Sequence, residues 1–129
     1  VVLFESTVKE NIVFGKEYDE KLFREVLEDV YMYDIVMSKG GIEAKVGDEI
    51  SGFSGGQLQR LAFARALYQE RSVLFLDEAT SSLDEEVENK IMDKILSKYK
   101  EKTIIAIVHK EAIADKFGKI IRLKDGKNC

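Results

Sequence analysis

Residues 73–84 read VLFLDEATSSLD, four apolar residues followed by two acids and a run of small polar residues. A short continuous apolar run is typical of a strand covered on both faces, so residues 73–76 predict a strand in the centre of a parallel sheet. Asp77 and Glu78 then lie at the carboxyl end of this strand, where open α/β sheets bind their ligands. Two acids after a strand more often form a solvated turn, and the run that follows them weakens that interpretation.

The residues after this stretch predict a second parallel strand. Apolar positions at helical spacing indicate a helix from Asp84 to about Lys100, and residues 103–108 form another apolar run. A strand, a helix and a second strand predict a right-handed crossover. His109, the single histidine, follows directly. A lone histidine is usually a surface residue, but this position places its imidazole at the same sheet edge as Glu78, where it could hydrogen-bond a phosphate and an attacking water.

Upstream of the strand, residues 54–60 read SGGQLQR. Ser54 is a good N-cap for a helix that continues to about Glu70, and this helix is apolar around most of its circumference, which predicts burial. Gly55 and Gly56 expose backbone N–H groups where the helix N-terminus carries partial positive charge, so this tip could receive a phosphate. Ser-Gly-Gly alone would favour a plain capped loop, whereas the seven-residue string is more specific.

The remaining segments predict further helices and one more strand, which together indicate an α/β fold. Residues 19–38 predict one amphipathic helix, or two shorter ones, with Asp19 as N-cap. The glycine-containing residues 39–53 predict a loop. A short helix near 110–116 and a last strand near 119–124 are expected before the turn Asp125-Gly126.

The composition of the chain limits the number of domains and the kinds of partner that it can have. The chain has 129 residues and 45% hydrophobic content, enough for one domain or part of one. Its net charge of −4, without a basic cluster, makes nucleic acid an unfavourable partner. Cys129 is the only cysteine, which excludes a disulfide within the chain and suits a reducing, cytoplasmic compartment. No apolar run approaches the ~20 residues that cross a bilayer. The chain starts at Val1 with a strand-like run rather than methionine, so we expect an excised segment.

Together these strings resemble the ATP-binding-cassette (ABC) family, over nearly the whole chain. Residues 54–57 resemble its signature sequence, with Phe53 where leucine is usual, and residues 73–78 resemble its Walker B strand. Residues 82–84 resemble its D-loop, and His109 resembles its switch histidine. The opening residues 3–12 resemble the segment after the Q-loop in exporter-type cassettes, and residues 43–49 more loosely resemble the exporter loop that touches the transmembrane coupling helices.

The resemblance implies a partial P-loop NTPase fold with a parallel-strand core and a helical subdomain. Residues from about 11 to 70 would form the helical, signature-bearing subdomain, and residues from about 71 to 129 the Walker B and switch-histidine part of the core. A P-loop needs glycine, four residues, glycine, lysine and then serine or threonine, and no such string occurs in the chain. We therefore expect the Walker A half of the site to lie upstream and the fragment alone to be inactive.

In the family, ATP is bound between the P-loop of one cassette and the signature of its partner. The resemblance thus implies Asp77 as the Mg²⁺ ligand, Glu78 as the catalytic base and His109 as the γ-phosphate switch. It implies that Asp84 communicates between the two sites. The implied reaction is ATP hydrolysis that powers transport, in a head-to-tail cassette dimer attached to transmembrane domains at the cytoplasmic face of a membrane. Phosphate contact across the interface is implied for Ser54, Gly55, Gly56 and Gln57.

Two alternatives remain. A soluble ABC ATPase of repair or translation usually adds a coiled-coil insertion or a basic face, and neither is seen in this sequence. A regulatory cassette would bind nucleotide without turnover, because fold alone does not confer activity, but Glu78 and His109 are both present. Transport specificity would reside in the membrane segments.

Overall fold

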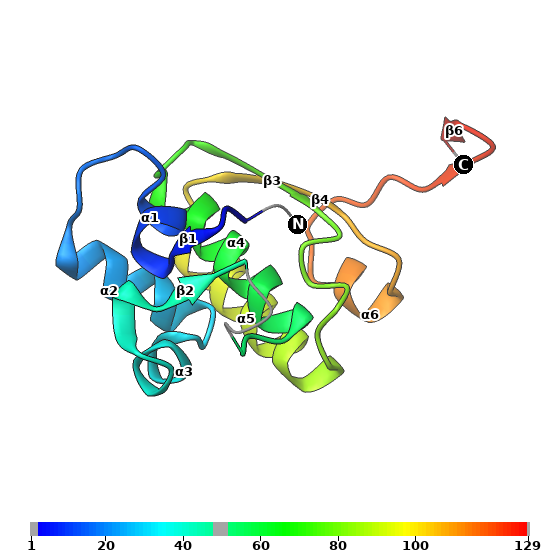
Figure 1. Ribbon diagram of the computed structural model, residues 1–129. Coiled ribbons are helices and arrows are strands. Elements are labelled where there is room, and N and C mark those ends of the chain that lie inside the picture. The colour runs from blue at the N-terminus through cyan, green and yellow to red at the C-terminus, as the bar shows by residue number, and fades with distance from the viewer. Residues whose placement is uncertain (1–2, 48–51, 129) are drawn as a thin grey trace.

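The computed structural model describes residues 3–47 and 52–128 (Figure 1). Val1, Cys129 and part of the 43–49 loop therefore lie outside the described residues. Two antiparallel two-residue strand pairs flank a parallel pair, with helices between them. The elements in chain order are β1 Ser6–Thr7, α1 Val8–Val13, α2 Glu20–Asp29, α3 Tyr33–Ser38, a 3₁₀ turn Gly41–Glu43, β2 Lys45–Val46, α4 Gly55–Tyr68, β3 Val73–Asp77, α5 Glu85–Lys98, β4 Thr103–Ile107, α6 Glu111–Ala114, β5 Leu123–Lys124 and β6 Lys127–Asn128.

The predicted strand–helix–strand unit is confirmed. β3 and β4 pair in parallel, with Val73 opposite Thr103 and Asp77 opposite Ile107, and α5 connects them. Because both strands run in the same direction, their carboxyl ends meet at one edge. This edge holds the acids after β3 and the histidine after β4.

Helix α4 lies at the centre of the helical part, as its apolar circumference predicts. α1 and α2 pack against it, and in Figure 1 both lie to the left of α4, as does α3. Its side chains Leu61, Ala64 and Leu67 are buried in one cluster with residues of α2 and α5. Tyr68 anchors the loop before α2, because its hydroxyl donates to the carbonyl of Glu17 at 2.6 Å and accepts from the N–H of Asp19 at 2.8 Å.

The predicted helix over 19–38 is two helices. Asp19 caps α2 by accepting from the N–H of Leu22 at 3.0 Å, as predicted, and the chain turns at Tyr31, whose φ is +57°. The guanidinium of Arg60 donates to the Tyr31 carbonyl at 3.1 Å and so fixes this turn against α4. α1 was not predicted. It is six residues long, too short for a clear helical period, and Thr7 caps it.

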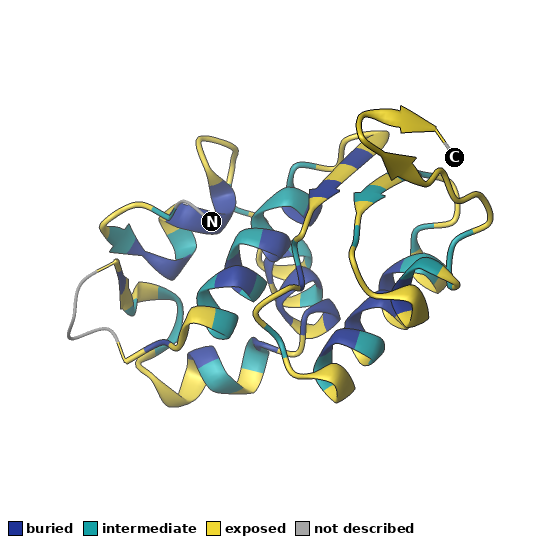
Figure 2. Ribbon diagram, turned by 90° about the vertical axis from the view of Figure 1, so that its right-hand side faces the viewer, coloured by how far each residue is buried: buried dark blue, intermediate teal, exposed yellow. Residues whose placement is uncertain are grey.

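The prediction that the strand at 73–76 is covered on both faces is wrong for the described residues. Leu74 and Leu76 are buried in the cluster that contains Ile91 of α5, whereas Val73 is 51% and Phe75 is 60% exposed. On β4, Ile105 and Ile107 lie on the same face of the sheet as Phe75 and are likewise exposed. The physical reason is that helices cover one side of this sheet only. In Figure 2, buried and exposed residues alternate along β3, and partly buried and exposed residues alternate along β4.

Two further predictions fail in detail. β3 pairs only with β4 within residues 3–47 and 52–128, so it is not a central strand there. The expected strand at 119–124 is reduced to β5, which forms a hairpin with β6 around Asp125 and Gly126. This hairpin extends away from the body (Figure 1), where Ile121 and Leu123 remain exposed. Residues 3–4, the described part of the strand-like run at the start of the chain, form no strand.

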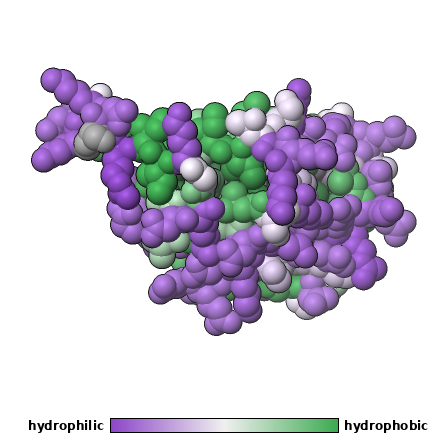
Figure 3. Space-filling view, turned by 180° about the vertical axis from the view of Figure 1, so that it is seen from behind, coloured by the Kyte–Doolittle hydropathy of each residue, from purple (hydrophilic) through white to green (hydrophobic). Residues whose placement is uncertain are grey.

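No helix among the described residues is long and apolar enough to cross a bilayer. The β3–β4 sheet exposes an apolar face formed by Val73, Phe75, Ile105 and Ile107. Figure 3 shows hydrophobic side chains gathered on the back of the molecule, beside the polar carboxy-terminal extension.

Candidate functional site

Glu78 and His109 lie in direct contact at the shared edge of β3 and β4. The Nε2 atom of His109 hydrogen-bonds Oε1 of Glu78. Both side chains are accessible, 46% for Glu78 and 74% for His109, so a ligand could reach them from solvent. The adjacency that the strand order predicted is therefore present.

The backbone of Glu78 adopts an unusual conformation. Its φ is +49°, in the left-handed region that non-glycine residues rarely enter. Three hydrogen bonds hold it there: its N–H donates to the carbonyl of Ile107 at 3.1 Å, and its carbonyl accepts from Nε2 of Gln59 at 3.0 Å and from the N–H of Ser81 at 3.1 Å. Asp77, directly before it, is the exposed last residue of β3. The left-handed conformation of Glu78 turns the chain sharply after Asp77.

The start of α4 forms the second part of the site. Ser54 and Gln57 make a capping box, in which Ser54 Oγ accepts from the N–H of Gln57 at 3.2 Å and Gln57 Oε1 accepts from the N–H of Ser54 at 2.9 Å. The predicted cap is thus confirmed, and both side chains are engaged with the helix end itself. The N–H groups of Gly55 and Gly56 belong to the first turn, where helices have donors without an intrahelical acceptor.

Gly56 is required by close packing. A Cβ atom at this position would lie 3.1 Å from the carbonyl oxygen of Ser82 and 3.2 Å from Cδ2 of Leu83. The tip of α4 therefore rests directly on the loop that leads to Asp84. Asp84 caps α5 by accepting from the N–H of Val87 at 2.9 Å, so its carboxylate has a structural role in addition to the predicted one.

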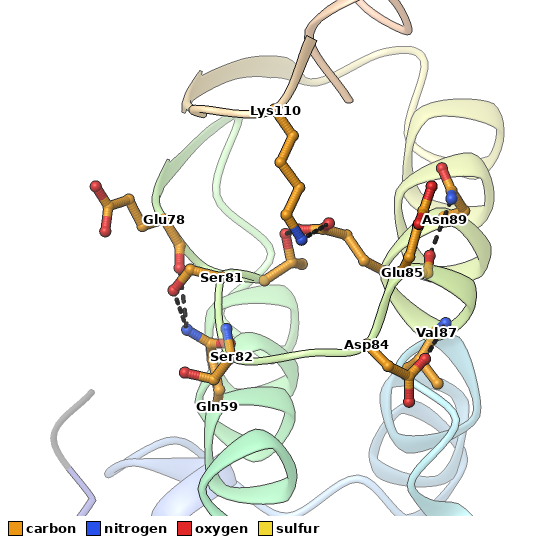
Figure 4. A network of polar contacts seen from close by, with 11 residues as sticks. Gln59, Glu78, Ser81, Ser82, Asp84, Glu85, Val87, Asn89 and Lys110 are labelled. Carbon is orange, nitrogen blue, oxygen red and sulfur yellow. Dashed lines mark hydrogen bonds and ion pairs between the residues drawn. The ribbon is translucent and has the colours of Figure 1, made fainter. Parts of the chain in front are cut away.

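Gln59 connects the two parts of the site, a role that the sequence interpretation missed (Figure 4). Besides its bond to Glu78, its Nε2 lies 3.3 Å from Oγ of Ser81, and its Oε1 accepts from the N–H of Ser82 at 2.9 Å. Gln59 is only 6% exposed. A signal was available, because it is a polar residue in a helix otherwise read as apolar and buried.

Glu88 was missed as well. It is 3% exposed and accepts hydrogen bonds from Thr80 and Lys110. The hydrogen bond to Glu88 is the main cause that raises the pKa of Lys110. In the sequence, Glu88 stands three residues before Ile91, on the buried face of α5, which is the place where a carboxylate needs partners.

A profile of the ABC transporter family matches residues 1–81, more than half of the chain. The chain belongs to the ABC transporter family. The ATP-dependent lipid A-core flippase of Ralstonia nicotianae is 36% identical over 98% of the chain, and that of Paraburkholderia xenovorans is 38% identical over 98%. The chain spans about a fifth of their length, 22% and 21% respectively.

A solved structure agrees with this assignment. The chain is similar to a bacterial Atm1-family ABC exporter with ATP bound, with a TM-score of 0.90 and 28% identity over 99% of the chain and 23% of the exporter chain. These similarities confirm the exporter-type ABC resemblance and the α/β P-loop NTPase fold class.

Proposed function

We propose that this chain forms the carboxy-terminal half of an ABC nucleotide-binding domain that hydrolyses ATP to drive transport across a membrane. The observation that carries the proposal is the contact between Glu78 and His109 at the sheet edge. A carboxylate beside an imidazole can accept the proton of an attacking water while the imidazole donates to the phosphate that is leaving. The exporter-type relatives support the transport role.

In this proposal Glu78 is the general base and His109 contacts the γ-phosphate. Residues 11–70 form the helical subdomain, and residues 71–129 carry the Glu78 half of the core. Transfer of the phosphoryl group to water depends chiefly on positioning and charge stabilisation. The strained backbone of Glu78, fixed by three hydrogen bonds, supplies such positioning.

Asp77 would hold Mg²⁺, which would neutralise charge on the ATP phosphates. The described residues contain no cluster of three or more metal-ligating side chains. One exposed carboxylate still fits this ion, because Mg²⁺ usually keeps several waters and binds through one or two carboxylates plus substrate phosphates. Asp77 therefore fits an ion that arrives with the nucleotide.

Ser54, Gly55, Gly56 and Gln57 would contact the ATP held by a second cassette. The open first turn of α4 offers N–H donors and partial positive charge to an anion. Because Ser54 and Gln57 already cap the helix, the backbone of the two glycines would make the first contacts. We propose a head-to-tail cassette dimer that is joined to transmembrane domains at the cytoplasmic side, with Asp84 at the connection between its sites; the similarity to full-length exporters supports the link to a transporter.

The decisive experiment replaces Glu78 by glutamine in the complete transporter that carries this chain. The amide keeps the size of the side chain and can still hydrogen-bond His109, but it cannot accept a proton. We expect nucleotide binding to persist and single-turnover ATP hydrolysis to fall roughly 10²–10⁴-fold. Glu101→Gln, in the exposed turn before β4, is the matched control and should hydrolyse normally. Near-normal turnover of Glu78→Gln would exclude Glu78 as the base, and a wild-type protein that binds but never hydrolyses ATP would indicate a regulatory cassette.

A further inference from the structure

Glu88 is a buried carboxylate with two partners, one on each of its oxygens. Its Oε2 accepts from the hydroxyl of Thr80 at 2.6 Å, and its Oε1 accepts from Nζ of Lys110 at 2.7 Å. The side chain of Glu88 is 4% exposed, so solvent contributes little to these contacts. Charge-assisted hydrogen bonds in such an environment are short and strong.

The two partners belong to the two loops that carry the candidate catalytic residues. Thr80 lies two residues after Glu78 in the loop that follows β3, and Lys110 directly follows His109 in the loop after β4. Figure 4 shows Lys110 extending from its loop towards α5. A small cavity of ≈ 70 Å³ lies between the loops, and Glu78, Glu88, His109 and Lys110 all line it. One carboxylate on α5 therefore joins both loops.

The loops need such a connection because the β-ladder does not extend to the reacting groups. The last paired residues of the two strands are Asp77 and Ile107, and the hydrogen bond from the Glu78 N–H to the Ile107 carbonyl is the last backbone bond between them. Glu78 and His109 are accessible, so side-chain packing alone gives them little restraint. A displacement of about 1 Å of a reacting group can cost roughly 10²-fold in rate.

We propose that Glu88 is a positioning residue that sets the separation of Glu78 and His109 by holding the loop after β3 through Thr80 and the loop after β4 through Lys110. The kinetic consequence rests on the proposed ATPase function, whereas the geometric consequence does not. Glu88 itself touches neither reacting group.

A purely structural role is the alternative, in which the ion pair only docks the α6 region against α5. The chain contains a matched control for it. Lys116, just after α6, forms an ion pair of 2.6 Å with Asp93 of α5. This pair joins the same two parts of the fold but does not involve the two catalytic loops. Lys116→Met should therefore reproduce any effect of docking alone.

The first experiment uses the imidazole signals of the 129-residue chain. His109 is the only histidine, so its ring ¹⁵N resonances are unambiguous. Thr80→Val keeps the shape of a buried side chain and removes one arm of the bridge, and Lys110→Met removes the other. Both should shift and broaden the Nε2 signal of His109, whereas Lys116→Met should leave it unchanged. Unchanged His109 spectra in folded Thr80→Val and Lys110→Met would overturn the proposal.

The second experiment measures ATP hydrolysis by the complete transporter. Thr80→Val and Lys110→Met should each lower kcat roughly 10- to 100-fold, with the KM for ATP within about two-fold of wild type. Lys110→Arg, which keeps the charge and a donor, should restore most of the rate. Since both arms act through one carboxylate, the double variant should lose less than the product of the single effects. A multiplicative loss, or an equal loss in Lys116→Met, would overturn the positioning role.

The two experiments separate the two ideas. A wild-type transporter without hydrolysis would refute the proposed function, while the His109 spectra would still decide whether Glu88 positions the loops. Glu88→Ala leaves Lys110 and Thr80 without their acceptor and could unfold the chain, and for this reason the conclusion depends on the milder Thr80 and Lys110 variants.

Discussion

The side-chain amide of Gln59 donates a hydrogen bond of 3.0 Å to the backbone carbonyl of Glu78. Gln59 lies on α4, five residues after Ser54, whereas Glu78 follows β3. The backbone strain at the candidate base is thus maintained from the helix whose tip carries the signature sequence. In the proposed dimer these two parts would face different ATP molecules, so Gln59 would connect one nucleotide site to the other within a single chain.

Gln59→Leu should lower both stability and hydrolysis. The substitution leaves the N–H of Ser82 without its side-chain acceptor and removes one of the two donors to the carbonyl of Glu78, which keeps the N–H of Ser81 at 3.1 Å. Each lost hydrogen bond costs about 0.5–1.5 kcal/mol. The free energy of unfolding of the chain can be measured in urea, and ATP turnover in the complete transporter. Release of the Glu78 backbone should reduce turnover more than the loss of stability alone would.

A second glutamine provides the comparison. Gln69, at the other end of α4, donates to the carbonyl of Val13 at 3.2 Å, far along the helix from the site. Gln69→Leu should lower stability but leave the turnover of the folded protein unchanged. If the two variants reduced turnover equally, the link from Gln59 to Glu78 would have no specific role.

Ser54→Asp should block ATP-driven dimerisation without removing the helix cap. Aspartate is as good an N-cap as serine, so α4 should remain intact, while its negative charge would repel the phosphate of the partner's ATP. Ser54→Ala should instead lose the cap and about 1 kcal/mol of stability. Size-exclusion chromatography with ATP, on cassettes that carry Glu78→Gln to prevent turnover, should show dimers for the parent and monomers for Ser54→Asp. Dimers of Ser54→Asp would exclude phosphate contact at this position.

The parts of the site that were predictable depend on short-range patterns. The apolar runs around residues 73–76 and 103–108 predict two strands, and the helix between them requires parallel pairing, which brings Glu78 and His109 to one edge. Asp19 and Ser54 were recognisable as caps because capping is a contact within three residues. These conclusions needed no knowledge of distant contacts.

The missed residues all act over long distances in the chain. Gln59 contacts a loop about twenty residues away, and Glu88 contacts Lys110 across the crossover. Their partners are set by how α4 and α5 pack, which the local pattern does not specify. An apolar run likewise indicates that a strand is apolar but not what covers each face, so the local pattern does not specify that Phe75 lies on the exposed face.

The exposed face of the β3–β4 sheet should make the 129-residue chain self-associate. One face of the parallel pair carries four exposed residues, Val73, Phe75, Ile105 and Ile107. They alternate with buried residues on β3 and with partly buried residues on β4. Contiguous apolar surface with unpaired strand edges favours association. Phe75→Lys should shift sedimentation profiles towards monomer, whereas Tyr31→Lys, at an exposed aromatic residue in the helical part, should not. A concentration-independent monomer of the wild-type chain would contradict this expectation.

A buried acid, Asp29, joins α2 to the end of α5. Its carboxylate accepts from Nζ of Lys98 at 2.7 Å and from the hydroxyl of Tyr99 at 2.6 Å, and Asp29 is 2% exposed. The pKa of Tyr99 is raised well above its usual range, mainly by burial and secondly by the hydrogen bond to Asp29. Burial lowers the pKa of Lys98, but its bonds to Asp29 and Glu25 outweigh this effect and raise it overall.

These shifts predict a loss of stability at alkaline pH. Both groups have pKa values that are higher in the folded than in the unfolded chain, so the folded state binds more protons above pH ~10, where the unfolded Tyr and Lys side chains deprotonate. The stabilisation is complete below that pH and is lost as the pH rises through the folded values. Tyr99→Phe should lower the free energy of unfolding by about 1 kcal/mol at pH 8, because one hydrogen bond is removed. From pH 9 to 11, the free energy of unfolding of this variant should fall less steeply than that of the wild type. Urea unfolding at several pH values measures this slope, with Tyr31→Phe as an exposed control that should keep the wild-type slope. Equal slopes for wild type and Tyr99→Phe would show that the phenol of Tyr99 titrates alike in the folded and unfolded chain.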